Sequence, residues 1–334
     1  MKRILRGLIV APFLMAVLGA AVLALTAPKP PPPIAAIQSV SPVMARYARE
    51  QPAPCFITAR DGGRLSYRLY PGRPGSGVAV AVHGSSGNTV ALHGLATALS
   101  ARGITVYSVD LRGHGLSPGP YGRLGDVVYR GQYEDDLADF AGLARREHPG
   151  ERLLLLGHSM GGSTILRTAS LPAYAGNYDA YLALSPFIEP GGSMDRPNQG
   201  GWTSVSVPRI VVLSILNRFG ISALDHMTVL AMAVPADDHN QRPGSYSHAL
   251  LASANLPRDW KPSIAAVRAP TRVLIGARDE LFVAEAYPRE VGGANPKIAV
   301  SVLAGVTHMG IVTDPAAQAQ IGTAALALLG GKQP

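Results

Sequence analysis

Residues 153–163 read LLLLGHSMGGS, a run of four leucines followed at once by the pattern G-x-S-x-G around Ser159. The apolar run is typical of a buried strand, and the segment after the serine can begin a helix immediately. A strand, a sharp turn and a helix together form a nucleophile elbow, in which Gly157 and Gly161 leave room where strand and helix pass closely. The stretch therefore predicts an α/β fold with a reactive Ser159 at the end of a strand.

The same pattern occurs again at residues 115–119, which read GLSPG with Ser117 at the centre, so the pattern alone does not identify a nucleophile. Ser117 lies several residues beyond the apolar run that ends at Asp110, and the prolines and glycines after it do not begin a helix. We therefore interpret Ser117 as a loop residue and Ser159 as the candidate nucleophile.

Short apolar runs alternate with helical patterns from about Cys55 onward. Segments between the runs have apolar residues at helical spacing and end in Gly or Pro-Gly. The pattern predicts a doubly wound, mostly parallel α/β sheet, and FITARDGGRLSYRLYPG ahead of it predicts an antiparallel hairpin. The runs expected to be strands buried on both faces are GVAVAVHG, GITVYSVD, RLLLLGHS, AYLALSP, TRVLIGARDE and KIAVSVLAG.

The alternation stops at about residues 187–266, where the chain is rich in Gly, Pro and apolar helical patterns and no strand is expected. This stretch is too long for an ordinary connection and predicts a helical cap inserted into an α/β domain that covers residues 55–334. Val212, Leu216 and Phe219 follow helical spacing together with Ile215. Such a helix is expected to cover an apolar surface.

The N-terminal segment has the features of a membrane-directed sequence. Lys2, Arg3 and Arg6 precede an uncharged run over residues 7–28, and its length matches the roughly 20 residues that span a bilayer. We expect residues 1–27 to be a membrane anchor or, if they are cleaved, a signal segment. The third interpretation is a buried helix of the folded domain.

Residues 28–54 include the stretch PKPPPPIAAIQ and are expected to form a Pro-rich, semi-rigid linker. The excess of positive charge before the apolar run predicts that the N-terminus stays in the cytoplasm. The folded domain would then lie on the extracytoplasmic, periplasmic side, held to the membrane by the anchor or secreted there after cleavage.

Composition limits the classes of partner. Hydrophobic residues make up 47% of the chain and charged residues 16%, which indicates a folded protein rather than a disordered one. The formal net charge of +8 comes from scattered basic residues without the dense stripe and aromatics typical of nucleic-acid binding, so we expect no nucleic-acid partner. A mild attraction to anionic lipid remains open.

Cys55 is the only cysteine, so no internal disulfide can form and the cysteine content does not indicate the cellular compartment. The oligomeric state also stays open.

A serine hydroxyl needs a base, and the base needs a carboxylate that orients it. VLIGARDELF places Asp279 just past one expected strand, and VLAGVTHMG places His308 just past the next. Open α/β sheets carry their sites at these C-terminal strand ends. Ser159, Asp279 and His308 are therefore the candidate catalytic residues.

The other histidines and the neighbouring carboxylate fit these roles less well. His158 is expected to point away from the adjacent serine, and His226, His239 and His248 lie in the cap. Glu280 would face away from Asp279 because it is the next residue along the chain.

Acyl transfer also needs two donors for the oxyanion. The turn AVHGSSGN follows an expected strand, and we nominate the backbone amides of Ser85 and of Met160, the residue after the nucleophile, with His83 and Gly84 shaping the turn. A plain strand-to-helix turn is the alternative.

Six motifs together resemble the α/β-hydrolase superfamily, specifically the bacterial lysophospholipase and monoacylglycerol lipase-like serine hydrolases. The resemblance covers roughly residues 56–329, apart from the cap. It implies that Ser159 is the nucleophile, Asp279 the acid and His308 the base, and that the cap covers an acyl pocket. The motifs are HGSSGN, VDLRGHGLSPG, YEDDLADF, GHSMGGS, GARDELF and GVTHMG.

These features predict a serine hydrolase that cleaves carboxylic esters of lipid type, such as lysophospholipids or monoacylglycerols, through an acyl-enzyme. The alternatives are a thioesterase or amidase on the same triad, a cofactor-free oxygenase or perhydrolase on the same fold, and a non-catalytic membrane-tethered binding protein. No cofactor or metal is expected. We interpret the acidic cluster of Asp135, Asp136 and Asp139 as a solvated helix face, and residues 237–239 as a polar loop.

Overall fold

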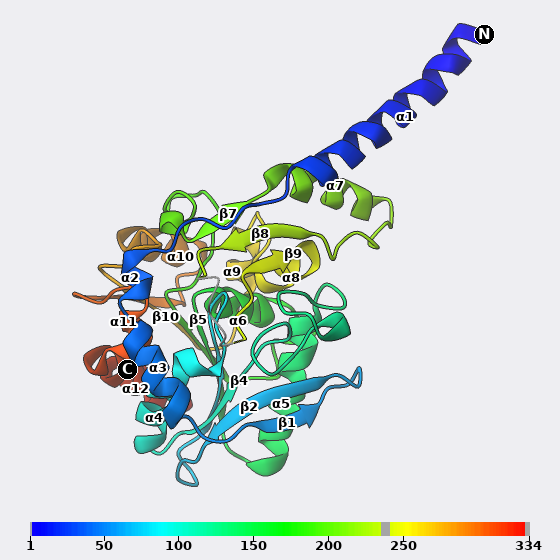
Figure 1. The fold of residues 1–334 in the computed structure, drawn as a ribbon. Coiled ribbons are helices and arrows are strands. Elements are labelled where there is room, and N and C mark those ends of the chain that lie inside the picture. Colours follow the sequence, from blue (N-terminus) through cyan, green and yellow to red (C-terminus); the bar gives the residue numbers. More distant parts are fainter. Residues whose placement is uncertain (1, 235–240, 331–334) are drawn as a thin grey trace.

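The computed structural model describes residues 2–234 and 241–330, with side chains from residue 14 onward apart from Ala36. A mixed sheet lies at its centre, and the N-terminal helix α1 (Lys2–Leu25) projects from the rest of the chain (Figure 1). The polar loop expected at residues 237–239 lies outside the described residues.

The described part of the chain contains an eight-stranded sheet in the order β1-β2-β4-β3-β5-β6-β10-β11. The antiparallel hairpin of β1 and β2 pairs antiparallel with β4, and the remaining neighbours are parallel. The expected doubly wound, mostly parallel sheet with a preceding hairpin is confirmed. The strands are β1 (Cys55–Thr58), β2 (Arg64–Tyr70), β3 (Val78–Val82), β4 (Thr105–Val109), β5 (Leu153–His158), β6 (Ala180–Leu184), β10 (Thr271–Gly276) and β11 (Ala299–Leu303).

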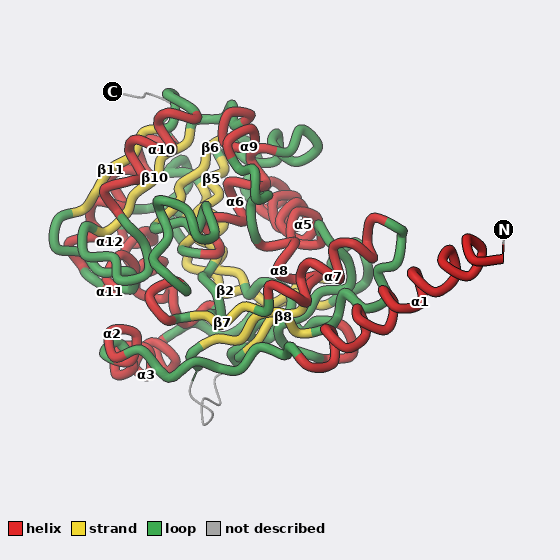
Figure 2. Tube along the Cα trace, turned by 90° about the horizontal axis from the view of Figure 1, so that it is seen from above, coloured by secondary structure: helices red, strands yellow, loops and turns green. Residues whose placement is uncertain are grey.

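Successive residues of the central strands face two separate cores. Val80 and Leu155 pack toward α5, α6, α9 and α10, whereas Ala81 and Leu156 pack toward α4 and α12. Every residue of β3, β4, β5 and β6 is buried, as continuous apolar runs predict. The layers can be followed from above in Figure 2. The helices are α4 (His93–Ala101), α5 (Gln132–Glu147), α6 (Met160–Ser170), α9 (Lys261–Ala266), α10 (Tyr287–Ala294), α11 (Gly310–Thr313) and α12 (Pro315–Leu329).

The edge strand β11 departs from that expectation, because only Leu303 of its five residues is buried. The strand pairs with β10 on one side and ends the sheet. An apolar run therefore predicted the strand but not its exposure, which depends on the position in the sheet.

The cap between β6 and β10 is not wholly helical. Within the described residues it contains a three-stranded antiparallel sheet, β7-β8-β9, where we expected no strand. These strands are three to five residues long, and a run such as TVLAM does not distinguish a short strand from a helical turn by periodicity. The cap elements are β7 (Thr203–Val205), α7 (Val207–Arg218), β8 (Thr228–Met232), β9 (Ser245–Ser247) and α8 (His248–Ala254).

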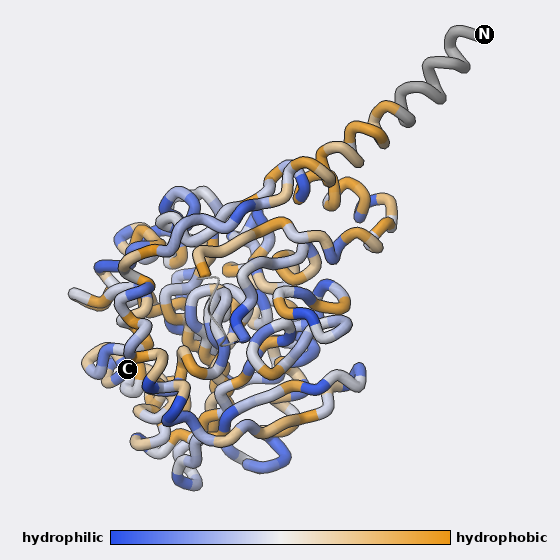
Figure 3. The backbone as a smooth tube through the Cα atoms, viewed as in Figure 1, coloured by the Kyte–Doolittle hydropathy of each residue, from blue (hydrophilic) through white to orange (hydrophobic). Residues whose placement is uncertain are grey.

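Helix α7 is the expected apolar helix, but its apolar face is only partly covered. Leu213 is buried against Leu23 at the end of α1, and Arg209 Nη2 donates to the Leu23 carbonyl at 2.5 Å. Ile215 is half exposed and Phe219 is 79% exposed. Figure 3 shows the hydrophobic residues of α7 beside those of α1.

No helix in the part of the chain with described side chains is long and apolar enough to cross a membrane. The expected anchor at residues 1–27 falls partly on residues 2–13, whose side chains lie outside that part.

The predicted Pro-rich linker is partly helical. Residues 26–34 form neither helix nor strand, and they are followed by α2 (Ala35–Gln38) and α3 (Ser41–Glu50). Helix α3 packs on the domain through Tyr47, which is 5% exposed and meets the His93 ring edge-on at 5.1 Å between centroids. A Cβ added at Gly94 would lie 2.2 Å from Tyr47 Oη, so glycine leaves the space that Tyr47 fills.

We predict that Gly94→Ala lowers the free energy of unfolding by about 1–3 kcal/mol, because the new methyl group must displace Tyr47. Chemical denaturation measures the change. Gly292→Ala in α10 is the control, since a Cβ there meets nothing within 4 Å and should stabilise the helix by up to about 1 kcal/mol. Equal behaviour of the two variants would show that Tyr47 does not dock at Gly94.

Candidate active site

Ser159 lies on a tight turn between β5 and α6 with φ 54° and ψ −118°, a backbone conformation that non-glycine residues rarely adopt. A Cβ at Gly157 would lie 2.3 Å from the Gly161 carbonyl oxygen, and a Cβ at Gly161 would lie 2.4 Å from that of His83. Both positions therefore need glycine. The sequence motif forms the expected elbow, with Ser159 lining a cavity.

Asp279 and His308 meet at the ends of β10 and β11. His308 Nδ1 donates to Asp279 Oδ2 at 2.8 Å, while the backbone N–H groups of Leu281 and Phe282 each donate to Asp279 Oδ1 at 3.0 Å. Both side chains are buried. Because Nδ1 carries the proton shared with the carboxylate, Nε2 is the nitrogen left to accept a proton from a nucleophile.

Burial raises the pKa of Asp279, but the charge and hydrogen bond of His308 and the Leu281 amide outweigh it, so the pKa lies below its usual value. A lowered carboxyl pKa means that its stabilising contribution is present above the unfolded-state pKa and is lost as the pH falls through the folded-state value. Asp279 therefore remains ionised at neutral pH, as an orienting carboxylate requires.

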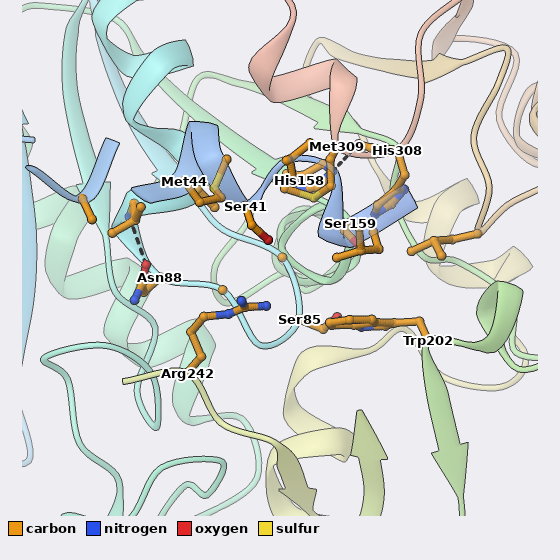
Figure 4. A pocket seen from close by; sticks show the side chains of 18 of the residues that line it. Ser41, Met44, Ser85, Asn88, His158, Ser159, Trp202, Arg242, His308 and Met309 are labelled. Atoms are coloured by element: carbon orange, nitrogen blue, oxygen red, sulfur yellow. Dashed lines mark hydrogen bonds between the residues drawn. The ribbon is translucent and has the colours of Figure 1, made fainter. Parts of the chain in front are cut away.

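The structure brings Ser159 and His308 to the wall of one cavity with Ser85 (Figure 4). Ser117 lies elsewhere. It is buried in the loop after β4, where its Oγ accepts the Ser66 N–H at 2.8 Å.

The two nominated oxyanion donors come from two different segments. Ser85 follows β3 and Met160 is the first residue of α6, and both line a cavity with Ser159. Among the described residues neither backbone N–H has a protein acceptor. The N-terminus of α6 adds a partial positive charge at this point, so the arrangement can stabilise an oxyanion.

The loop that carries Ser85 is held by the cap. Trp202 Nε1 donates to Ser85 Oγ at 2.9 Å. At Ser86, which has φ 55°, the N–H donates to Tyr246 Oη at 2.6 Å, the hydroxyl donates to the Pro243 carbonyl at 2.5 Å, and the carbonyl accepts from Arg242 Nε at 2.7 Å. All three polar groups of Ser86 are thus bound to residues 242–246.

Tyr246 also donates its hydroxyl hydrogen to His114 Nε2 at 2.7 Å. Burial raises the pKa of Tyr246 and lowers that of His114, with a further lowering by nearby His83, so both groups are neutral. One neutral hydroxyl can then accept from Ser86 and donate to His114 at the same time. The sequence did not indicate the roles of Tyr246 and His114, because the residues that they contact are far away along the chain.

His158, which was expected to point away from Ser159, contacts His308. Its ring packs on the His308 ring at 4.7 Å between centroids, and its Nε2 donates to the His308 carbonyl at 3.1 Å. Burial and the adjacent His308 lower the pKa of His158 to about 3, so it stays neutral. It supports the candidate base from the residue next to the nucleophile.

Glu280 also supports His308, since the His308 N–H donates to Glu280 Oε2 at 2.9 Å. The carboxylate that contacts the imidazole is that of Asp279. Of the cap histidines, His226 pairs with Asp126 and His248 with Asp225, away from Ser159, and His239 lies outside the described residues.

The acidic cluster on α5 is neutralised by arginines. Arg60 bonds to Asp135 at 2.8 Å and to Asp139 at 2.9 Å, and Arg112 bonds to Asp136 at 2.7 Å. These carboxylates tie α5 to the segment after β1 and the loop after β4.

We predict that Asp279→Asn lowers kcat by about 10⁴-fold, because an amide does not maintain the His308 tautomer. Steady-state kinetics on an ester substrate measures it. Glu280→Gln is the matched control, since its side-chain oxygen can still accept the His308 N–H, and it should stay within about threefold of wild type. The reverse ranking would make Glu280 the acid.

We also predict that Tyr246→Phe lowers kcat by about tenfold or more with little change in KM, because the Ser86 N–H loses its acceptor and the oxyanion loop loses its support. Tyr178→Phe is the control, as it removes a buried tyrosine hydroxyl that donates only to the Leu137 carbonyl. Equal kcat in the two variants would separate Tyr246 from the oxyanion loop.

The family model described as "Serine aminopeptidase, S33" matches residues 73–314. Among curated proteins, the chain is 26% identical over 229 residues to a monoacylglycerol lipase of Mycolicibacterium smegmatis, covering 66% of this chain and 77% of that protein. It is 26% identical over 262 residues to a probable esterase of Oryza sativa, covering 71% of this chain and 91% of that protein.

Solved structures share the fold. A soluble variant of monoglyceride lipase from Saccharomyces cerevisiae, in complex with a substrate analog, aligns with a TM-score of 0.61 at 17% identity over 85% of this chain and 97% of that one. Monoacylglycerol lipase from Paleococcus ferrophilus aligns with a TM-score of 0.56 at 19% identity over 80% and 99% of the two chains.

Proposed function

The chain belongs to the α/β-hydrolase family described as serine aminopeptidase, S33, and from this premise we propose that it is a serine hydrolase that cleaves carboxylic esters through an acyl-enzyme. The observation that carries the proposal is the Asp279–His308 hydrogen bond beside Ser159, with the amides of Ser85 and Met160 open to the same space.

In the proposed reaction Ser159 Oγ attacks the ester carbonyl carbon while its proton passes to His308 Nε2. The carbonyl oxygen becomes an oxyanion that accepts hydrogen bonds from the Ser85 and Met160 amides, each worth about 3–4 kcal/mol in comparable sites. The C–O bond then breaks, and His308 returns the proton to the leaving alkoxide. Water, deprotonated by His308, attacks the acyl-enzyme and releases a carboxylic acid and free Ser159.

Two cavities in the described residues are both lined by Ser159, and we propose that each holds one half of the ester. One, of about 450 Å³, is also lined by His308, His158 and Met309. The other, of about 380 Å³, is lined by cap residues and Met160 but not by His308. Because the leaving group must receive its proton from His308, we place it in the larger cavity and the acyl chain in the cap cavity.

We propose that the acyl group is a lipid chain, as in a lysophospholipid or a monoacylglycerol. The cap cavity is lined by Phe187, Leu230, Leu251 and other apolar side chains, and each buried methylene contributes about 0.8 kcal/mol. A relative named as a monoacylglycerol lipase supports this substrate class.

We further propose that residues 1–27 direct the chain to the membrane, with the hydrolase domain on the extracytoplasmic side. The support is the charge pattern of the sequence, in which Lys2, Arg3 and Arg6 precede the apolar run. Cell fractionation with alkaline extraction of the membranes tests it, and recovery in the cytoplasmic fraction would contradict it.

The mechanism is tested by labelling the protein with a fluorophosphonate, which reacts with activated serines. We expect one adduct, located at Ser159 by peptide mass spectrometry, and its loss in Ser159→Ala with unchanged thermal stability. Ser117→Ala is the control and should still be labelled. Failure to label the folded wild-type protein would overturn the serine mechanism.

A series of p-nitrophenyl esters then tests the acyl assignment. The value of kcat/KM should rise by roughly threefold to fourfold for each added methylene until the cap cavity is filled. A flat series would argue against a lipid acyl group, and faster turnover of the matching thioester would favour a thioesterase.

A further inference from the structure

We propose that residues 35–50, here called the N-terminal arm, form a wall of the leaving-group cavity and favour esters whose alcohol group is larger than glycerol and carries an apolar part. The inference rests on the proposed function and deepens it. The arm lies before residue 73, where the family match begins.

The arm is docked on the domain by specific contacts. Tyr47 fills the space left by Gly94 and packs on His93. After α3, Thr89 Oγ1 donates to Gln51 Oε1 at 3.2 Å, and Arg68 Nη1 donates to the Pro52 carbonyl at 2.8 Å. The arm is therefore held at both the helix and the chain that follows it.

The opposite side of the arm faces the cavity. Ile37, Val40, Met44 and Ala48 line it at helical spacing and are half-buried. Ala45, also in the lining, is exposed and lies at the rim. Figure 4 shows Met44 across the cavity from Arg242 and Ser85. One face of α3 thus binds the domain while another supplies an apolar wall.

This wall lies on the side of the site where the alcohol leaves. His308 lines the same cavity as Met44 and Ala48, and it is the group that must protonate the departing oxygen. The alcohol part of a bound ester therefore extends from Ser159 along the arm, whereas the acyl part extends under the cap.

The cavity is larger than a small polyol alone can fill, and its lining combines apolar side chains with polar ones such as Asn88 and Arg242. At a share of about 30 Å³ for each heavy atom, six heavy atoms of a three-carbon polyol occupy at most about 180 Å³, less than half of the 450 Å³ present. Val90, Ala91 and Leu281 extend the apolar lining beyond the arm. An alcohol with an aryl or alkyl body would bury this surface against the arm.

The test compares two esters with one acyl group, 2-naphthyl hexanoate and methyl hexanoate, in wild type and in Ala48→Trp. Both esters form the same acyl-enzyme, and kcat/KM covers binding and acylation, the steps in which the two alcohol groups differ. We expect Ala48→Trp to lower kcat/KM for the naphthyl ester by about tenfold or more and to leave the methyl ester within about twofold. The variant-to-wild-type ratio cancels the different reactivities of the two esters.

Arg49→Trp is the matched control, because residue 49 is on the same helix but outside the cavity lining, and both esters should keep their wild-type rates. If Ala48→Trp does not fold, Ala45→Trp at the exposed rim takes its place with the same expectation. An equal loss for both esters, or no loss for either, would overturn the role of the arm. Failure of wild type to cleave either ester, together with no fluorophosphonate adduct, would instead overturn the proposed function.

Discussion

The site depends on one strained residue held in place from several directions. Ser159 has φ 54°, a conformation that costs a non-glycine residue about 1–3 kcal/mol. Its N–H donates to the Leu184 carbonyl at 2.9 Å, and its own carbonyl accepts from Ser163 at 3.1 Å and Phe187 at 3.2 Å. These bonds connect the turn to β6, to α6 and to the start of the cap. The buried strands on either side thus keep the serine side chain at the cavity and leave the next amide free.

Segments outside the central sheet complete what the strand ends begin. The sheet supplies Ser159, Asp279 and His308, but the loop with Ser85 is held by cap residues such as Trp202. The N-terminal arm closes the other side through Met44 and its neighbours. In the proposed reaction the chemistry therefore resides in the shared fold, whereas the cap and the arm shape the space for the two halves of a substrate.

The sequence was informative where local pattern and chain order suffice. Asp279 and His308 could be nominated because each follows an apolar run, and the structure brings them into hydrogen-bond contact. The roles of His158 and Tyr246 could not be predicted, since their partners are 150 and 160 residues away. The helices of the arm could not be predicted because prolines precede them. Their docking depends on the space that Gly94 leaves for Tyr47, and no periodic pattern in the sequence indicates this contact.

The binding of Ser86 to residues 242–246 also limits how the fold can diversify. A cap that is exchanged for one of different sequence removes the acceptors of the Ser86 N–H and hydroxyl and the donor to its carbonyl in one event. The turn after β3 and the end of the cap therefore have to be exchanged together, although they are far apart in the chain. The proposed acyl cavity can then be altered with fewer lost contacts by substitutions within the cap, at positions such as Leu230, than by replacement of the whole cap.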